Sequence, residues 1–138
     1  MISALVQIAA SFVNFAGSEE NAAALVSALH DGRPVVLSYP THDDPETPVP
    51  MTIETPAIPM AANDVRMALM LARDALVNIG VSRPTGEQLR AVLLGGELVT
   101  PSGRRVGMRG VLTMRSEGFN WGRIASERFQ RPLVVRLD

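Results

Sequence analysis

Residues 2–15 constrain the fold more than any other part of the sequence, because their pattern is that of a helix apolar around most of its circumference. The polar residues Ser3, Gln7, Ser11 and Asn14 recur at helical spacing and make one narrow stripe. A helix that is apolar on nearly every side must bury most of its surface. Three placements meet this requirement: a central core helix, a contact helix between subunits, or an anchor lying on a membrane surface.

The same stretch supplies the residues that we expect to support self-association. They are the large apolar side chains of Ile2, Leu5, Ile8, Phe12 and Phe15. A membrane span needs about 20 apolar residues, so this shorter, interrupted stretch predicts no span. The first charged residue is Glu19, so no basic region precedes the apolar stretch and no export signal is evident. As it stands the chain is expected to be cytoplasmic; a chain that had lost a signal peptide would look the same, so localisation stays open.

The clearest helix pattern covers residues 63–79. Its apolar residues recur at spacings of three and four, which places them on one helix face, and they are Val65, Leu69, Ala72, Leu76 and Ile79. Gly80 is a natural stop for this helix. We expect residues 63–79 and the N-terminal helix to form the core.

Capping and turn residues predict the other elements. One helix begins after Ser18 and stops at Gly32, and another opens at Thr85 with Gln88 in capping-box spacing. Extended patterns occupy residues 34–39, 51–55, 97–100, 104–107 and 133–137, and two short helices occupy 109–117 and 120–129. The sequence therefore predicts one α+β domain over residues 1–138, mostly helical, with one or two small β-hairpins.

The formal net charge of −1 hides an asymmetry between the two parts of the chain. Residues 1–80 hold three Arg and nine acidic residues, a net of −6, whereas residues 81–138 hold ten Arg and five acidic residues, a net of +5. All 13 basic residues are Arg, whose planar fork suits phosphate and carboxylate groups. Either the basic part attracts a polyanion, or the two parts attract each other within one molecule or between copies.

Residues 111–125 resemble the helix-turn-helix of small DNA-binding proteins. Gly118 stands where the turn requires a positive φ, and Asn120 can cap the second helix. Ile124 and Ala125 match the pair that packs the second helix on the first. The alternative interpretation is a structural corner of two helices with no role in nucleic-acid binding.

The helix-turn-helix resemblance implies a set of contacts with DNA. The second helix would enter the major groove with its N-terminal residues leading, so Asn120, Arg123 and Ser126 would face the bases. The candidate phosphate contacts are Arg104, Arg105 and Arg115.

Five segments resemble those of a family of small uncharacterised proteobacterial proteins. They are FAGSEEN at residues 15–21, NDVRMALMLA at 63–72, PTGEQL at 84–89 with LGG at 94–96, GVLTMR at 110–115 and GFNWGRIA at 118–125. Members of that family commonly carry an export signal and have no established activity. The resemblance therefore implies no catalytic or binding residue, and it favours a role outside DNA recognition.

The residue types that enzymes of common classes need are largely missing. The chain has no Cys and no Lys, which excludes thiol nucleophiles, thiolate zinc sites and Schiff-base chemistry. His42, Asp43, Asp44 and Glu46 lie in a Pro-rich loop, where a solvated charge run is the alternative to a hard-cation site. We therefore expect no catalytic residues, no metal and no cofactor.

These observations favour a non-enzymatic structural or protein-interaction protein that self-associates through its apolar N-terminal helix. Its expected partner is another copy of the chain or another protein. The alternative is a small helix-turn-helix DNA-binding protein of regulatory or phage-related type, with DNA as its partner.

Overall fold

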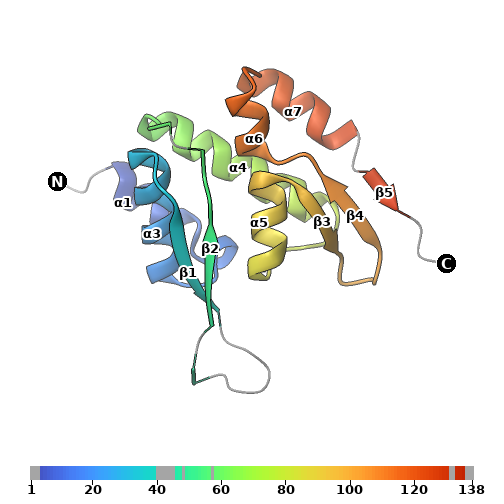
Figure 1. Ribbon diagram of the computed structural model, residues 1–138, viewed down its shortest axis with the longest axis horizontal. Coiled ribbons are helices and arrows are strands. Elements are labelled where there is room, and N and C mark those ends of the chain that lie inside the picture. Colours follow the sequence, from blue (N-terminus) through green and yellow to red (C-terminus); the bar gives the residue numbers. More distant parts are fainter. Residues whose placement is uncertain (1–3, 40–45, 48, 57, 131–132, 136–138) are drawn as a thin grey trace.

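The computed structural model describes residues 4–39, 46–47, 49–56, 58–130 and 133–135 (Figure 1). Within these ranges, seven helices surround the core and five short strands lie at its sides. The helices are α1 (Ala4–Ser11), α2 (Val13–Ala16), α3 (Glu19–Asp31), α4 (Ala62–Asn78), α5 (Gly86–Leu94), α6 (Val111–Ser116) and α7 (Trp121–Gln130). The mostly helical α+β fold predicted from the sequence is confirmed.

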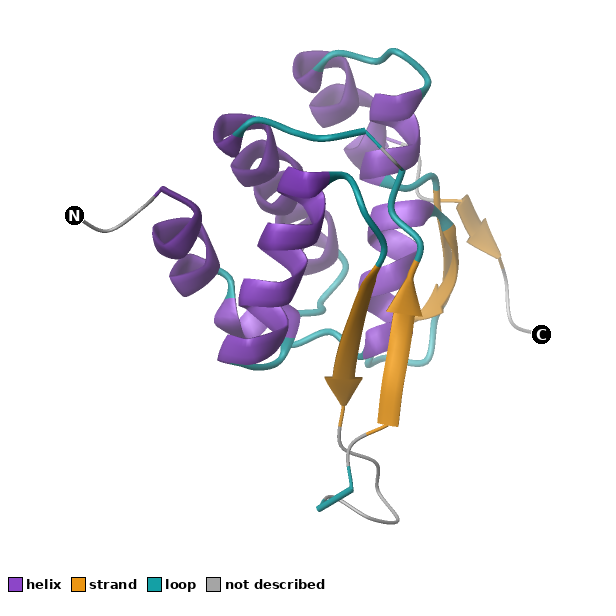
Figure 2. Ribbon diagram, turned by 60° about the vertical axis from the view of Figure 1, so that its left-hand side comes forward, coloured by secondary structure: helices purple, strands orange, loops and turns teal. Residues whose placement is uncertain are grey.

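The strands form two separate antiparallel sheets. Strands β1 (Val35–Tyr39) and β2 (Val49–Ile53) pair with Val35 opposite Ile53, and Figure 2 shows this hairpin along one side of the helices. Strands β3 (Gly96–Val99), β4 (Arg105–Met108) and β5 (Leu133–Val135) form the second sheet, with β4 in the centre. Both predicted hairpins are therefore present.

Helix α4 runs through the centre of the core. The residues that it buries are Val65, Ala68, Leu69, Leu71, Ala72, Ala75 and Leu76. They include four of the five apolar residues that the sequence pattern selected, and the fifth, Ile79, is half-buried just beyond the helix. The other helices contribute the rest of one continuous hydrophobic cluster, so the prediction of a core built on this helix is confirmed.

The predicted capping residues are confirmed by their hydrogen bonds. The Ser18 hydroxyl accepts the backbone N–H of Asn21 at 3.0 Å, and Gly32 ends α3 with a φ of +71°. At the start of α5, Thr85 and Gln88 form both bonds of the capping box. The local sequence thus specifies where these helices begin and end.

The N-terminal stretch differs from its prediction as one helix. It forms two helices, because Phe12 between them leaves the helical region with φ −119° and ψ 22°. This break allows Phe12 and Phe15 to be buried together, with ring centroids 6.0 Å apart in an edge-to-face arrangement. The packing of the two rings thus favours a break at Phe12 over one continuous helix.

A buried amide joins α3 to strand β1. The Asn21 side chain is 4% exposed; its Nδ2 donates to the carbonyls of Ala16 and Ser38, and its Oδ1 accepts the Ser38 N–H at 2.9 Å. The Tyr39 hydroxyl also donates to the Ala16 carbonyl at 2.9 Å, and burial raises the pKa of Tyr39 to about 12. Asn21 therefore forms with Ser38 the two hydrogen bonds that a neighbouring strand would form at this edge of β1.

Candidate functional site

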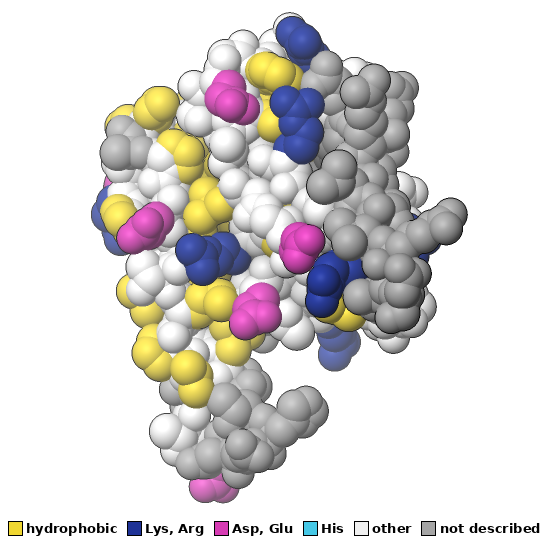
Figure 3. Space-filling view, turned by 45° about the vertical axis from the view of Figure 1, so that its right-hand side comes forward, with side chains coloured by type: hydrophobic (Ala, Val, Ile, Leu, Met, Phe, Trp, Pro, Cys, Tyr) yellow, Lys and Arg dark blue, Asp and Glu magenta, His cyan; other side chains and the backbone are white. Residues whose placement is uncertain are grey.

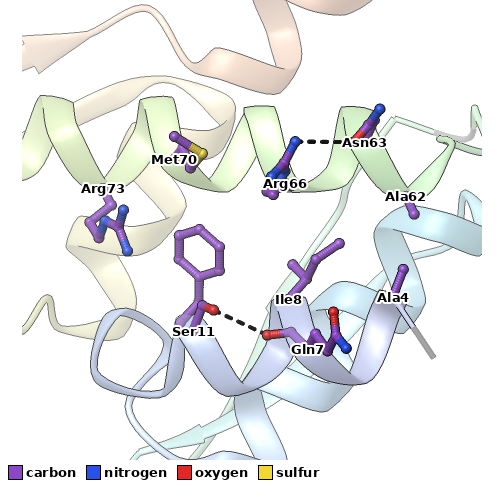
Figure 4. A pocket seen from close by; sticks show the side chains of 10 residues that line it. Ala4, Gln7, Ile8, Ser11, Ala62, Asn63, Arg66, Met70 and Arg73 are labelled. Carbon is purple, nitrogen blue, oxygen red and sulfur yellow. Dashed lines mark hydrogen bonds between the residues drawn. The ribbon is translucent and has the colours of Figure 1, made fainter. Parts of the chain in front are cut away.

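A groove of about 480 Å³ lies between α1 and α4 (Figure 4). Ile8 from α1, Phe12 just after α1 and Met70 from α4 provide its apolar side chains, while Gln7 and Ser11 add polar groups. The groove exists because α1 packs on α3 and leaves part of α4 uncovered. Its volume is in the range typical of ligand and peptide sites.

Two guanidinium groups stand on the α4 side of this groove. Arg66 is exposed and its Nη2 donates to Asn63 Oδ1 at 3.2 Å; Arg73 is half-buried, with Cζ 4.7 Å from the centre of the Phe12 ring. The described residues that line the groove include no Asp or Glu. The groove therefore combines apolar side chains with two positive charges.

The residues predicted for self-association are distributed over two environments. Ile8, Phe12 and Phe15 are buried within the chain itself, at 7%, 2% and 3% exposure, and Leu5 is half-buried. Ile2 lies outside the described residues. Self-association through this set would thus use Leu5 without rearrangement, whereas the three buried residues already contribute to the chain's own core.

The solvent side of α1 keeps an apolar surface of its own. This surface, the outer face of α1, consists of exposed Val6 and Ala10, half-buried Leu5 and Ala9, which also pack against the core, and Val13 at the start of α2. Val6 is 58% exposed. The outer face and the groove occupy different sides of the same helix, so each can be altered separately.

At the α6–α7 corner, the turn and capping residues adopt the conformations that the sequence predicts. Gly118 takes a φ of +99° between the helices, and Asn120 Oδ1 accepts the Arg123 N–H at 2.8 Å as the cap of α7. Ile124 is fully buried, and Ala125 packs against the core. The predicted roles of these residues in packing are confirmed; both interpretations of the corner require this geometry.

The arginines of this corner contact aromatic rings. Arg115 donates to the Phe119 carbonyl at 3.1 Å, and its Cζ lies 4.5 Å from the centre of the Trp121 ring. Arg123 is exposed and lies 4.5 Å from the centre of the Phe119 ring. Trp121 Nε1 donates to Asp64 Oδ1 at 2.9 Å, which ties α7 to α4. Arg115 therefore holds the turn together, and its contact with phosphate stays a prediction.

The predicted DNA contacts do not gather on one surface. Asn120, Arg123 and Ser126 are exposed on the first turns of α7. Arg104 and Arg105 lie where β4 begins after the β3–β4 turn; β4 pairs with β5, which follows the end of α7, but the turn lies away from the start of α7 (Figure 1). Figure 3 shows basic and acidic side chains interspersed on the described part of one face of the molecule, with no continuous basic patch.

No protein-family model, curated protein or solved structure matches this chain. The site must therefore be interpreted from its own geometry and chemistry.

Two sequence expectations concern metal and membrane. The described residues include no group of three or more His, Asp or Glu side chains that could hold a metal ion; His42, Asp43 and Asp44 lie outside that part of the chain. Among the helices described, none is long and apolar enough to cross a membrane.

Sequence reasoning missed the groove and its two arginines. Arg66 and Arg73 are seven residues apart, which places them on the same side of a helix after two turns. This spacing, with Met70 between the two arginines, could have indicated from the sequence that α4 has a second functional side. The uncovered length of α4 depends on how α1 packs, which local patterns do not specify.

Proposed function

We propose that the chain is a non-enzymatic protein-interaction protein that self-associates through the outer face of α1. The observation that carries this proposal is the exposure of contiguous apolar side chains on that face, with Val6 at 58%. Val6 and Ala10 are exposed while Ile8 is buried in the core, so a second molecule can approach the outer face without unfolding the first. Burial of such apolar surface is the main driving force of association.

Two features favour a second copy as the partner. Residues 4–16 carry no charge, so the same surface can pack against itself in a two-fold contact without repulsion between like charges. The face is also small, because α1 has eight residues. A small interface predicts a weak, concentration-dependent dimer rather than an obligate one.

Substitution of Val6 tests this proposal. We expect Val6→Glu to lower the association constant at least about tenfold, because the charge would be buried in the dimer. Val77→Glu is the matched control, since Val77 is 56% exposed on α4 and lies outside the outer face. Sedimentation velocity over a concentration series measures both variants. Equal association of the two variants would contradict the assignment of the face.

A second candidate function is DNA binding through α7. The observation that favours it is the exposure of Asn120, Arg123 and Ser126 at the start of this helix, which is where a recognition helix meets base edges. The separation of Arg104 and Arg105 from the start of α7 and the interspersed charges weigh against it. We therefore place it second.

Gel-shift titration with duplex DNA at several salt concentrations tests the second candidate. Binding should weaken steeply as salt rises, Arg123→Ala should reduce discrimination between sequences, and Arg104→Ala should weaken binding to all sequences alike. Absence of salt-dependent binding to any duplex at low ionic strength would eliminate this function.

A further inference from the structure

We propose that the groove between α1 and α4 binds an acidic amphipathic helix from a protein partner. This inference rests on the proposed protein-interaction function and names the partner's chemistry, but it uses the opposite side of α1 from the self-association contact. Half-buried Met70, with the largely buried Ile8 and Phe12, gives the groove an apolar lining, and Arg66 and Arg73 give it two positive charges; this combination favours an acidic helix. The described lining contains no carboxylate that could neutralise these arginines in place of a ligand.

The shape of the groove fits a helix. Figure 4 shows α1 and α4 running side by side, with Ala4 opposite Ala62 at one end and Ser11 near Arg73 at the other. The groove thus extends over about two turns of α1, or about 11 Å, and about three turns of α4, or about 16 Å. An apolar helix face that lies between two helices is a recurrent mode of peptide recognition.

The spacing of the two arginines selects the charge pattern of the partner. Seven residues of α4 separate Arg66 from Arg73, a rise of about 10.5 Å along the helix. Two carboxylates that are seven residues apart on a partner helix have the same rise, so both can meet a guanidinium at once. A fatty acid has one carboxylate and would leave one of the arginines without a matching charge.

The two guanidiniums can turn toward such a partner at small cost. The Arg66 bond to Asn63 is solvent-exposed, and Arg73 contacts the Phe12 ring through a cation–π interaction. An exposed hydrogen bond such as that of Arg66 contributes little to stability; the cation–π contact of half-buried Arg73 with the buried Phe12 ring contributes more, and charge-assisted bidentate Arg–carboxylate bonds offset its loss. The groove therefore needs only side-chain adjustment to receive an acidic helix.

Fluorescence anisotropy with two synthetic peptides tests the proposal. Both peptides carry Leu at positions i, i+4 and i+7 of one helix face; the acidic peptide has two Glu seven residues apart beside that face, and the basic peptide has Lys at the same two positions. We expect the full-length chain to bind the acidic peptide at least about tenfold more tightly than the basic one. Raising the salt concentration should reduce this preference.

Charge reversal of the groove provides the second part of the test. The double variant R66E/R73E should no longer bind the acidic peptide and should bind the basic peptide more tightly than the acidic one. The double variant R83E/R90E is the matched control, because it changes the net charge equally at two exposed sites outside the groove and should keep the original preference. R66E alone is also measured, because Arg66 is exposed and its reversal should leave folding intact even if the double variant unfolds.

Four results would overturn the proposal. The first two are equal binding of both peptides and an affinity unchanged by R66E. The third is that the chain does not bind the acidic peptide but does bind a probe that dodecanoate displaces. This would indicate a small amphiphile as the ligand. The fourth is loss of self-association in R66E, which would indicate a second copy in the groove. Val6→Glu should keep peptide binding, so failure of the self-association proposal is distinguishable from failure of this one.

Discussion

Gly110→Ala is expected to destabilise the protein by about 3 kcal/mol or more and to lower the thermal midpoint by roughly 10 °C. Gly110 precedes α6 with a φ of +87°, a conformation that costs an alanine about 1–2 kcal/mol. A Cβ at this position would also overlap the carbonyl carbon of Leu94 and the backbone nitrogen of Gly95, and would lie 2.7 Å from the Leu94 carbonyl oxygen. Backbone atoms cannot move aside as a flexible side chain can, so the end of α5 and the start of α6 would have to move apart.

Gly80→Ala is the matched control for this prediction. Gly80 has the same φ of +87°, but a Cβ there would meet no atom within 4 Å. Its substitution should cost only the conformational part, about 1 kcal/mol. Chemical denaturation followed by circular dichroism measures both variants. Equal losses in the two variants would show that the contact between α5 and the start of α6 is looser than described.

Asn21→Ala is expected to lower the free energy of unfolding by about 3 kcal/mol. The substitution removes three side-chain hydrogen bonds and leaves the N–H and carbonyl of Ser38 without the amide that joins them to α3. A polar group that loses its partner costs about 1–3 kcal/mol where water cannot replace it, and the bonds to Ser38 are part-buried. The Ala16 carbonyl keeps its bond from Tyr39, and the Ser18 cap uses the backbone N–H of residue 21, so these two interactions persist.

Two further variants make the Asn21 result interpretable. Asn78→Ala removes an exposed amide at the end of α4 and should change stability by less than about 0.5 kcal/mol. Asn21→Asp keeps the acceptor for Ser38 but places a carboxylate against two carbonyl oxygens. This repulsion raises the pKa of the new carboxyl in the folded state, so the loss should be largest at neutral pH and should shrink as acid protonates the group. Urea denaturation at pH 7 and pH 4 measures these changes; an Asn21→Ala variant as stable as the parent chain would contradict the bridging role.

Most helix and strand positions could be predicted because local residues specify them. Ser18, Gly32 and Thr85 act on backbone groups within a few residues, so their effects are visible in the sequence. The same holds for Gly118 and Asn120, which define the α6–α7 corner whatever its function. The break at Phe12 was not predicted, because it depends on the packing of its ring against Phe15.

The candidate site could be predicted only in part, because it depends on contacts between distant segments. The groove forms because α1 does not fully cover the part of α4 that carries Arg66 and Arg73. No short-range sequence pattern specifies the distance between these two helices. Likewise, Asn21 is polar and lies in a helix, yet it is buried because β1 packs against it. The bond between Trp121 and Asp64 joins residues 57 positions apart. Sequence patterns identify such residues only after the fold is known.

The most direct test of the proposed function is the molar mass of the full-length chain in solution. Light scattering across a concentration series should show a mass that rises from 14.8 kDa toward twice that value, as the proposed weak two-fold contact through the outer face of α1 requires. The increase should persist at high salt, since the face carries no charge. A mass that stays at 14.8 kDa at the highest attainable concentration would contradict self-association.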